Sequence, residues 1–238
     1  MFKNIFNKKK EENEIVIKNE LSRSIRYLLD GSNIGTQPVE RQKVLIKILK
    51  IICSSLNYQM AYQTLRVPHS TANITGWYYP KNYYEVKKYK TIELMENPVY
   101  IESNEAAMIV QPWNNERIVD NLLHIGGDSG NDLDESNMNI INAYIYPLGI
   151  VMCENGNHSQ FSGILQNDMK QIKITSIIDI SESLDTVTVD EEENLKSEAY
   201  FDFEDSVYTE EIKDIFRIGL YLRKFPEVYP DEIIKKCN

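Results

Sequence analysis

The sequence has few of the residues from which proteins build disulfide, zinc or redox sites. Its 238 residues include three cysteines, Cys53, Cys153 and Cys237, which are widely spaced and form no Cys-x-x-Cys pair. Their odd number and spacing give no support to a disulfide framework or a zinc site, so we expect a reduced protein of the cytoplasm and no metal. The three histidines form neither HxxxH nor H-x-E, and Walker A, GxGxxG and GxSxG motifs are missing. The sequence therefore assigns no catalytic residue and no cofactor.

Long hydrophobic runs are also missing. No apolar stretch approaches the 18 residues that a membrane-spanning helix needs. The basic first ten residues are followed by Glu11, Glu12 and Glu14 instead of the apolar core of a secretory signal. We therefore expect no membrane association.

Positive charge is scarce and unevenly distributed. The net charge is −10, but residues 1–100 hold 16 Lys and Arg against 9 Asp and Glu, whereas residues 101–181 hold 3 against 11. Residues 182–238 hold 7 against 16, and most of these acidic groups lie in 182–214, which we predict to be a solvated loop or helix face. An acidic chain cannot attract nucleic acid through its average charge, so any such role must be local.

The first 65 residues are predicted to be helical. Apolar residues recur at helical spacing from Asn13 to Asp30, and Gly31 is placed to end that helix. A second helix is predicted from Thr36 to about Tyr62, with Pro38 in its first turn. We expect the two helices to pack as a hairpin or against the rest of the protein.

Residues 66–98 form a connector rich in tyrosine and lysine. Aromatic residues alternate with cations, a pattern that can stack bases and hold phosphates. The lysines that would bind nucleic acid are Lys81, Lys87, Lys88 and Lys90. The alternative is a linker whose tyrosines pack on the protein with their hydroxyls at the surface.

Residues 99–181 are predicted to form an αβ core. Strands are expected at 99–102, 106–110, 144–153 and 172–180. A helix capped by Asn114 or Asn115 should run to Gly126, and a short helix should run from Ser159 to Gln166. In residues 182–238, the acidic segment precedes a last helix that Ser206 or Thr209 can cap and Pro226 closes. The fold class is α+β: N-terminal helices, a small mixed sheet with short helices, and a C-terminal helix.

The turn at Gly156, Asn157, His158 and Ser159 carries the features of a polar site. Glycine permits an unusual backbone conformation, and the free amides and positive dipole of a helix N-terminus attract an anion. The alternative is that Asn157 and Ser159 only cap the helix and that His158 fills a polar gap. The nearby Cys153 is predicted to be a poor nucleophile, because burial and the adjacent Glu154 raise a thiol pKa.

The order of these segments resembles the ParB/sulfiredoxin-like fold. The resemblance is carried by AAMIVQP, Asn115-Glu116-Arg117, LLHIG, YPLGIVM and ENGNHSQFSGIL, which together span roughly residues 99–180. Members of that superfamily bind CTP, ATP or related nucleotides at the corresponding turn. The resemblance implies that Gly156, Asn157, His158 and Ser159 face the phosphates, with Asn115 and Arg117 opposite. The family has an arginine where this chain has Ser159, and the whole chain also resembles bacterial proteins of unknown function that share the Gly-Asn-His-Ser turn.

Three functions follow as hypotheses. The first is binding of a nucleotide or another phosphorylated ligand at the Gly156–Ser159 turn. The second is a non-enzymatic protein-interaction scaffold that uses the basic N-terminal half and the acidic segment to contact a protein partner. The third is DNA binding through the tyrosine- and lysine-rich connector.

Overall fold

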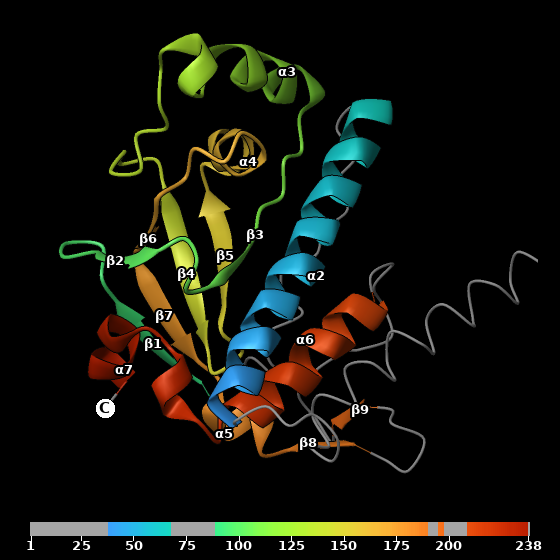
Figure 1. Ribbon diagram of the computed structural model, residues 1–238, viewed down its shortest axis with the longest axis vertical. Coiled ribbons are helices and arrows are strands. Elements are labelled where there is room, and N and C mark those ends of the chain that lie inside the picture. Colours follow the sequence, from blue (N-terminus) through green and yellow to red (C-terminus); the bar gives the residue numbers. More distant parts are fainter. Residues whose placement is uncertain (1–37, 68–88, 190–194, 198–208, 238) are drawn as a thin grey trace, which may run out of the picture.

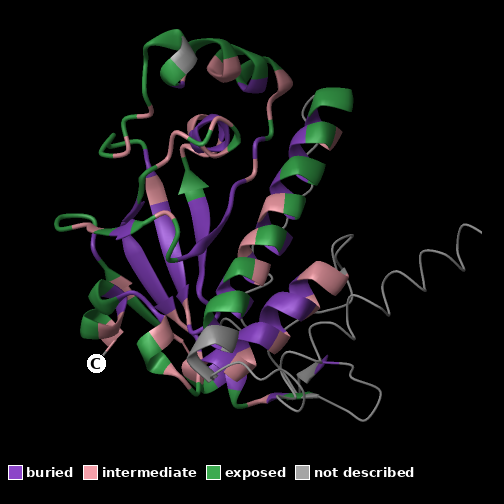
Figure 2. Cartoon of the chain, in the orientation of Figure 1, coloured by how far each residue is buried: buried purple, intermediate pink, exposed green. Residues whose placement is uncertain are grey.

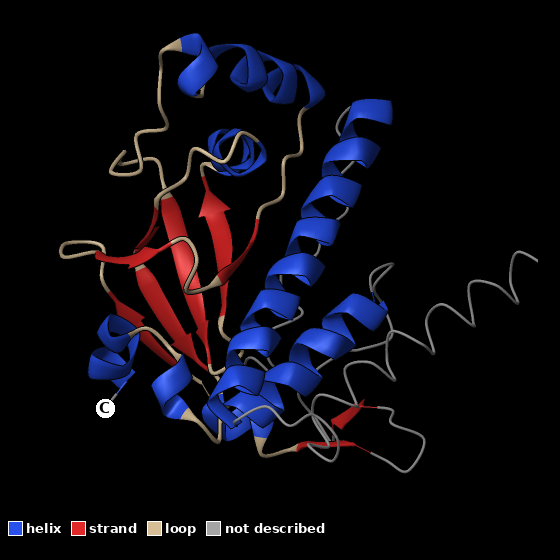
Figure 3. Cartoon of the chain, in the orientation of Figure 1, coloured by secondary structure: helices blue, strands red, loops and turns tan. Residues whose placement is uncertain are grey.

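The protein has an α+β fold in which helices cover both faces of a mixed sheet (Figures 1 and 3). A computed structural model describes residues 38–67, 89–189, 195–197 and 209–237. The fold class therefore agrees with the one predicted from the sequence. The predicted helix at 13–30 and most of the connector lie outside the described residues, and the proposed division into domains stays a prediction.

The central sheet has five strands in the order β1-β7-β4-β5-β3. These strands are Lys90–Glu93, Ser176–Asp179, Ile141–Tyr146, Ile150–Asn155 and Ala107–Ile109 in that order. β1 and β7 are antiparallel, as are β4 and β5, while β4 with β7 and β3 with β5 are parallel. Two smaller sheets pair β2 (Val99–Glu102) with β6 (Gln171–Ile174), and β8 (Val187–Val189) with β9 (Leu195–Ser197).

The helices divide between the two faces of this sheet. The long α2 (Pro38–Arg66) and α6 (Thr209–Leu222) form a hydrophobic core with one face of the sheet. On the other face of the sheet, a second hydrophobic core includes residues of α3 (Asn115–His124), α4 (Asn157–Leu165) and α7 (Asp231–Cys237). The short α5 (Ser181–Leu184) and the 3-10 turns η1 (Gly127–Ser129) and η2 (Pro226–Val228) lie in connections. Because successive strand residues point to opposite faces, Ile145 joins the first core and Tyr144 the second. The buried strands lie between exposed outer helix faces (Figure 2).

Polar side chains of α2 bind the backbone along the edge strand β3. Lys50 Nζ donates to Ser103 O at 2.9 Å, and Thr64 Oγ1 donates to Pro112 O at 2.9 Å. Between them, Asn57 Nδ2 donates to Met108 O and Asn57 Oδ1 accepts from Val110 N, both at 2.9 Å. The three side chains are seven residues apart, so they share one face of the helix. This row fixes α2 to β3 and its flanking loops.

The prediction of one strand over 144–153 is wrong. The chain forms two antiparallel strands, β4 and β5, joined by a tight turn at Pro147–Gly149. The Tyr146–Pro147 peptide is cis, Gly149 has a φ of 72°, and Gly149 N donates to Ile145 O at 3.1 Å. Both strands lie inside the sheet and are apolar on both faces, so the run has no polar residue to mark the turn.

The prediction of one strand over 172–180 is also wrong. Thr175 separates β6 from β7, which belong to different sheets. Its backbone N and its Oγ1 both donate to Asn142 O at 2.9 Å, while Asn142 N donates to Thr175 Oγ1 at 3.0 Å. These bonds turn the chain at Thr175.

The acidic segment contains ordered structure. Asp214 lies in α6, is 4% exposed, and accepts a hydrogen bond from Arg217 Nη1 at 2.6 Å. The prediction of solvated acidic groups is therefore wrong for Asp214, and residues 190–194 and 198–208 lie outside the described part of the chain. Helix α7, after Pro226, was not predicted.

One described helix is long and apolar enough to cross a membrane. It runs from Gln42 to Arg66 within α2, and half of its apolar stretch is buried inside the protein. Packing against the sheet is consistent with this composition, because a helix in the core of a soluble protein can be equally long and apolar. The architecture is compatible with a soluble protein.

Candidate functional site

The predicted turn begins helix α4. Gly156 is the N-cap, with a left-handed φ of 84°, and a Cβ atom there would lie 3.3 Å from Ile140 Cγ1. The unusual backbone expected at this glycine is therefore present. The helix starts at Asn157, two residues earlier than predicted, so Ser159 lies within its first turn. No side chain caps this helix end.

Asn157 and His158 hold the loop before α3. Asn157 Oδ1 accepts from Gln111 N at 2.6 Å, and His158 Nε2 accepts from Asn114 N at 3.1 Å. His158 is 6% exposed, and its ring lies edge-on to Trp113, with centroids 5.4 Å apart. Burial and then the charge of Arg117 lower the pKa of His158 to about 4. The imidazole is therefore neutral near pH 7, with its acceptor nitrogen already used within the protein.

Arg117 approaches the same corner from α3. Asn115 is the first residue of that helix, and Asn114 provides its cap, since its Oδ1 accepts from Arg117 N at 2.9 Å. The Arg117 guanidinium lies 5.6 Å from the centroid of the exposed Trp113 ring. Among the described residues it has no carboxylate partner. The structure thus gathers Arg117 and His158 around Trp113, a residue that the sequence reasoning did not single out.

A buried amide pair lies behind the turn. Asn142 and Gln160, both almost fully buried, exchange hydrogen bonds of 3.0 Å through their side chains. Gln160 Nε2 also donates to Cys153 Sγ at 2.9 Å, and Asn142 Nδ2 donates to Lys173 O at 2.8 Å. Burial, reinforced by Glu154, raises the pKa of Cys153, which confirms the prediction of a poor nucleophile. The pair fixes α4 on the sheet.

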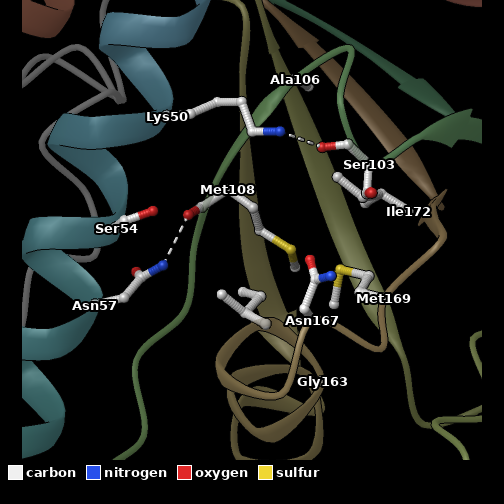
Figure 4. Close-up of a pocket in the computed structure, with 11 residues that line it drawn as sticks. Lys50, Ser54, Asn57, Ser103, Ala106, Met108, Gly163, Asn167, Met169 and Ile172 are labelled. Carbon is white, nitrogen blue, oxygen red and sulfur yellow. Dashed lines mark hydrogen bonds between the residues drawn. The ribbon is translucent and has the colours of Figure 1, made fainter.

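A cavity of about 170 Å³ lies between α2, β3 and the end of α4 (Figure 4). Its polar lining comes mainly from α2, which contributes Lys50, Ser54 and Asn57, and Ser103 and Asn167 add to it. Its apolar wall includes Met108, Met169 and Ile172. Burial lowers the pKa of Lys50. The sequence alone does not single out Lys50, because the residues that complete the cavity lie about fifty to more than a hundred positions away.

The predicted nucleic-acid lysines are only partly described. Lys90 is exposed at the start of β1. Lys81, Lys87 and Lys88 lie outside the described residues. DNA binding therefore stays a prediction.

The comparison with protein families gives a match over nearly the whole chain. A model of a family of unknown function, DUF6710, matches residues 3–227. The chain belongs to the DUF6710 family. No curated protein and no solved structure matches it. The DUF6710 match includes the sequence before α2 as well as the described core up to η2, and the resemblance to the ParB/sulfiredoxin-like fold stays a prediction.

Proposed function

We propose that this protein binds a small ligand with an anionic head group and an apolar body in the Lys50 cavity. The proposal rests on the position of the Lys50 ammonium group at the wall of a cavity whose lining is more apolar than polar, although Ser103 and Asn167 add polar groups outside α2. Within the described part of the chain, Nζ donates one hydrogen bond, to Ser103 O, and a lysine has three protons to donate. We propose that the other two donors bind a carboxylate or phosphate.

The charge of Lys50 supports an anionic ligand. Among the described residues, no aspartate or glutamate lines the cavity, so none of these residues neutralises the ammonium group. Burial disfavours the charged lysine, as the lowered pKa shows, and a bound anion would stabilise it. The ligand and the protonated lysine would thus favour each other.

The volume limits the size of the ligand. An apolar cavity of about 150 Å³ accepts benzene, and this cavity is about 170 Å³. A short-chain or aromatic monocarboxylate has suitable dimensions, with its head group near Lys50 and Ser54 and its body against Met108 and Met169.

Binding can be tested with butyrate, hexanoate and benzoate. We expect at least one of them to stabilise the protein by about 2.7 kcal/mol at a hundredfold excess over Kd, measured by thermal unfolding. Lys50→Met should abolish the effect because it keeps most of the apolar side chain and removes the charge. Lys47→Met, a lysine exposed on the same helix, should retain it. Equal stabilisation of Lys50→Met, or none of the wild type by any of the three acids, would contradict the proposal.

A second candidate function is binding of a phosphorylated ligand at Arg117. It is supported by the Arg117 guanidinium, which has no carboxylate partner among the described residues, and by the start of α4, where the described chain supplies no side-chain cap. The resemblance to ParB/sulfiredoxin-like proteins favours a nucleotide. One observation weighs against this function. Asn157 Oδ1 and His158 Nε2 already accept hydrogen bonds from the backbone of Gln111 and Asn114, so these two atoms are engaged within the protein.

Nucleotide binding has its own matched control. ATP, GTP, CTP or UTP with magnesium should raise the melting temperature of the wild type but not of Arg117→Met. Arg66→Met is the control, since Arg66 also lies over an aromatic ring, that of Tyr62, at 5.8 Å. If none of the four nucleotides shifts the wild type, or if Arg66→Met loses the shift equally, Arg117 is not a nucleotide site.

A cytoplasmic location and a role as a protein-interaction scaffold are secondary proposals. A cytoplasmic location fits three cysteines that are all free thiols. A scaffold role would use the acidic segment, which is described only in part.

A further inference from the structure

The outer face of α2 carries a regular apolar row. Val44, Ile51, Tyr58 and Leu65 are each seven residues apart, and Ile48, Ser55 and Tyr62 lie between them, so the row alternates steps of four and three. This is the spacing of a coiled-coil seam. The row extends about 32 Å along the helix. It is apolar at every position except Ser55.

Most of these side chains are exposed, although Ile48 is partly buried against the core and the Tyr58 ring lies edge-on to Phe161 of α4, with centroids 6.3 Å apart. Ile51 is 68% exposed and Val44 40%, whereas Leu45 and Leu49 on the opposite face are fully buried against the sheet and α6. Single exposed apolar residues are common, but a contiguous row at seam spacing indicates a docking surface. Figure 2 shows the exposed and buried faces alternating along this helix.

The chain itself contains a segment with a matching row. Residues 13–30 place Ile17, Leu21, Ile25 and Leu28 at helical spacing, directly before α2 in the sequence. The seven residues 31–37 would connect the two helices, and helix pairs are commonly joined by two to eight residues. The family model matches from residue 3, so its match includes this segment together with α2.

The two rows also fit in register. Suppose that Asp30 lies beside Pro38 in an antiparallel pair. Because both helices rise about 1.5 Å per residue, each step toward the N-terminus of the first helix lies level with one step toward the C-terminus of α2. Ile17 then lies level with Ile51. Leu21 and Ile25 lie level with Lys47 and Lys43, each within one residue, or about 1.5 Å along the axis, of Ile48 and Val44.

We propose that residues 13–30 pack as an antiparallel helix on the outer row of α2. This helix covers the aliphatic half of the row, Val44, Ile48 and Ile51. It ends before Tyr62, whose hydroxyl suits a water-exposed position. A second copy of the chain fits less well, because an antiparallel pair of α2 helices centred on Ser55 brings Lys43 and Lys47 of each copy near Arg66 of the other. The connected segment also has the advantage of a high effective concentration.

Cysteine labelling of the full chain tests this packing. Ile51→Cys and Tyr62→Cys are compared by the rate of maleimide labelling, read at each site by peptide mass spectrometry. Cys53 and Cys153 are buried and Cys237 is partly buried, and the peptide readout separates them from the new thiols. We expect Cys at position 51 to react about tenfold more slowly than Cys at position 62, because access governs thiol reactivity.

Variants in the N-terminal segment identify the covering element. Leu21→Glu, on the apolar row, should restore rapid labelling of Ile51→Cys, whereas Asn19→Glu, off the row, should leave it slow. Equal labelling of positions 51 and 62 in the wild-type background would overturn the proposal. The proposal would also be overturned if position 51 were still labelled slowly in the Leu21→Glu variant and light scattering showed a dimer. That result would mean that a second copy of the chain covers the row.

Discussion

Asn57→Ala is expected to lower the free energy of unfolding by about 4 kcal/mol, because it leaves two buried backbone groups, Met108 O and Val110 N, without hydrogen bonds. The Asn57 side chain is 1% exposed, so water cannot easily replace it. Urea unfolding followed by circular dichroism measures the difference.

Gln59→Ala is the matched control for this substitution. Gln59 is exposed on the same helix and bonds only Ser55, so its loss should cost less than about 0.5 kcal/mol. A cost below about 1 kcal/mol for Asn57→Ala would show that α2 does not depend on this contact with β3.

Acidification is expected to destabilise the protein through His158. The folded-state pKa is lowered from 6.5 to about 4, so below pH 6.5 the unfolded chain binds a proton that the folded protein does not. Stability contributed by the neutral histidine is therefore complete above pH 6.5 and is lost as the pH falls toward 4. The loss reaches about 3 kcal/mol, at about 1.4 kcal/mol per pH unit.

His158→Gln isolates this contribution, because a glutamine oxygen can still accept from Asn114 N but does not titrate. Unfolding free energies of the two proteins are compared at pH 7, 5.5 and 4. The wild type should lose about 3 kcal/mol more than the variant over this range. Parallel pH profiles would mean that His158 is protonated equally in the folded and unfolded states.

Local signals predicted much of the fold. Pro38 begins α2, Asn114 caps α3, and the strand over 99–102 agrees with β2, because a first-turn proline, a capping side chain and a short β-like run act within a few residues. The two strand errors have different origins. Pro147 and Gly149 are local turn signals that the continuous apolar run outweighed, whereas the role of Thr175 depends on Asn142, 33 residues away.

The candidate site was less accessible to sequence reasoning. The unusual backbone expected at Gly156 is present, but the residues that bind Asn157 and His158, namely Gln111 and Asn114, are more than forty positions away. Lys50 becomes a candidate binding residue only once the fold is known, because β3 and the end of α4 complete the cavity beside it. Such convergence depends on tertiary packing, which no spacing along the chain reveals.

The hydrogen bonds from α2 to the edge strand β3 have a consequence for assembly. A strand at the margin of a sheet normally offers free backbone groups on which another chain can add, the route to sheet-mediated oligomers and aggregates. Here Asn57 occupies Met108 O and Val110 N, and the helix lies across the place where an incoming strand would pair. Growth of the five-stranded sheet by strand addition would therefore have to begin at β1, where Lys90 and Glu93 place charges that discourage it.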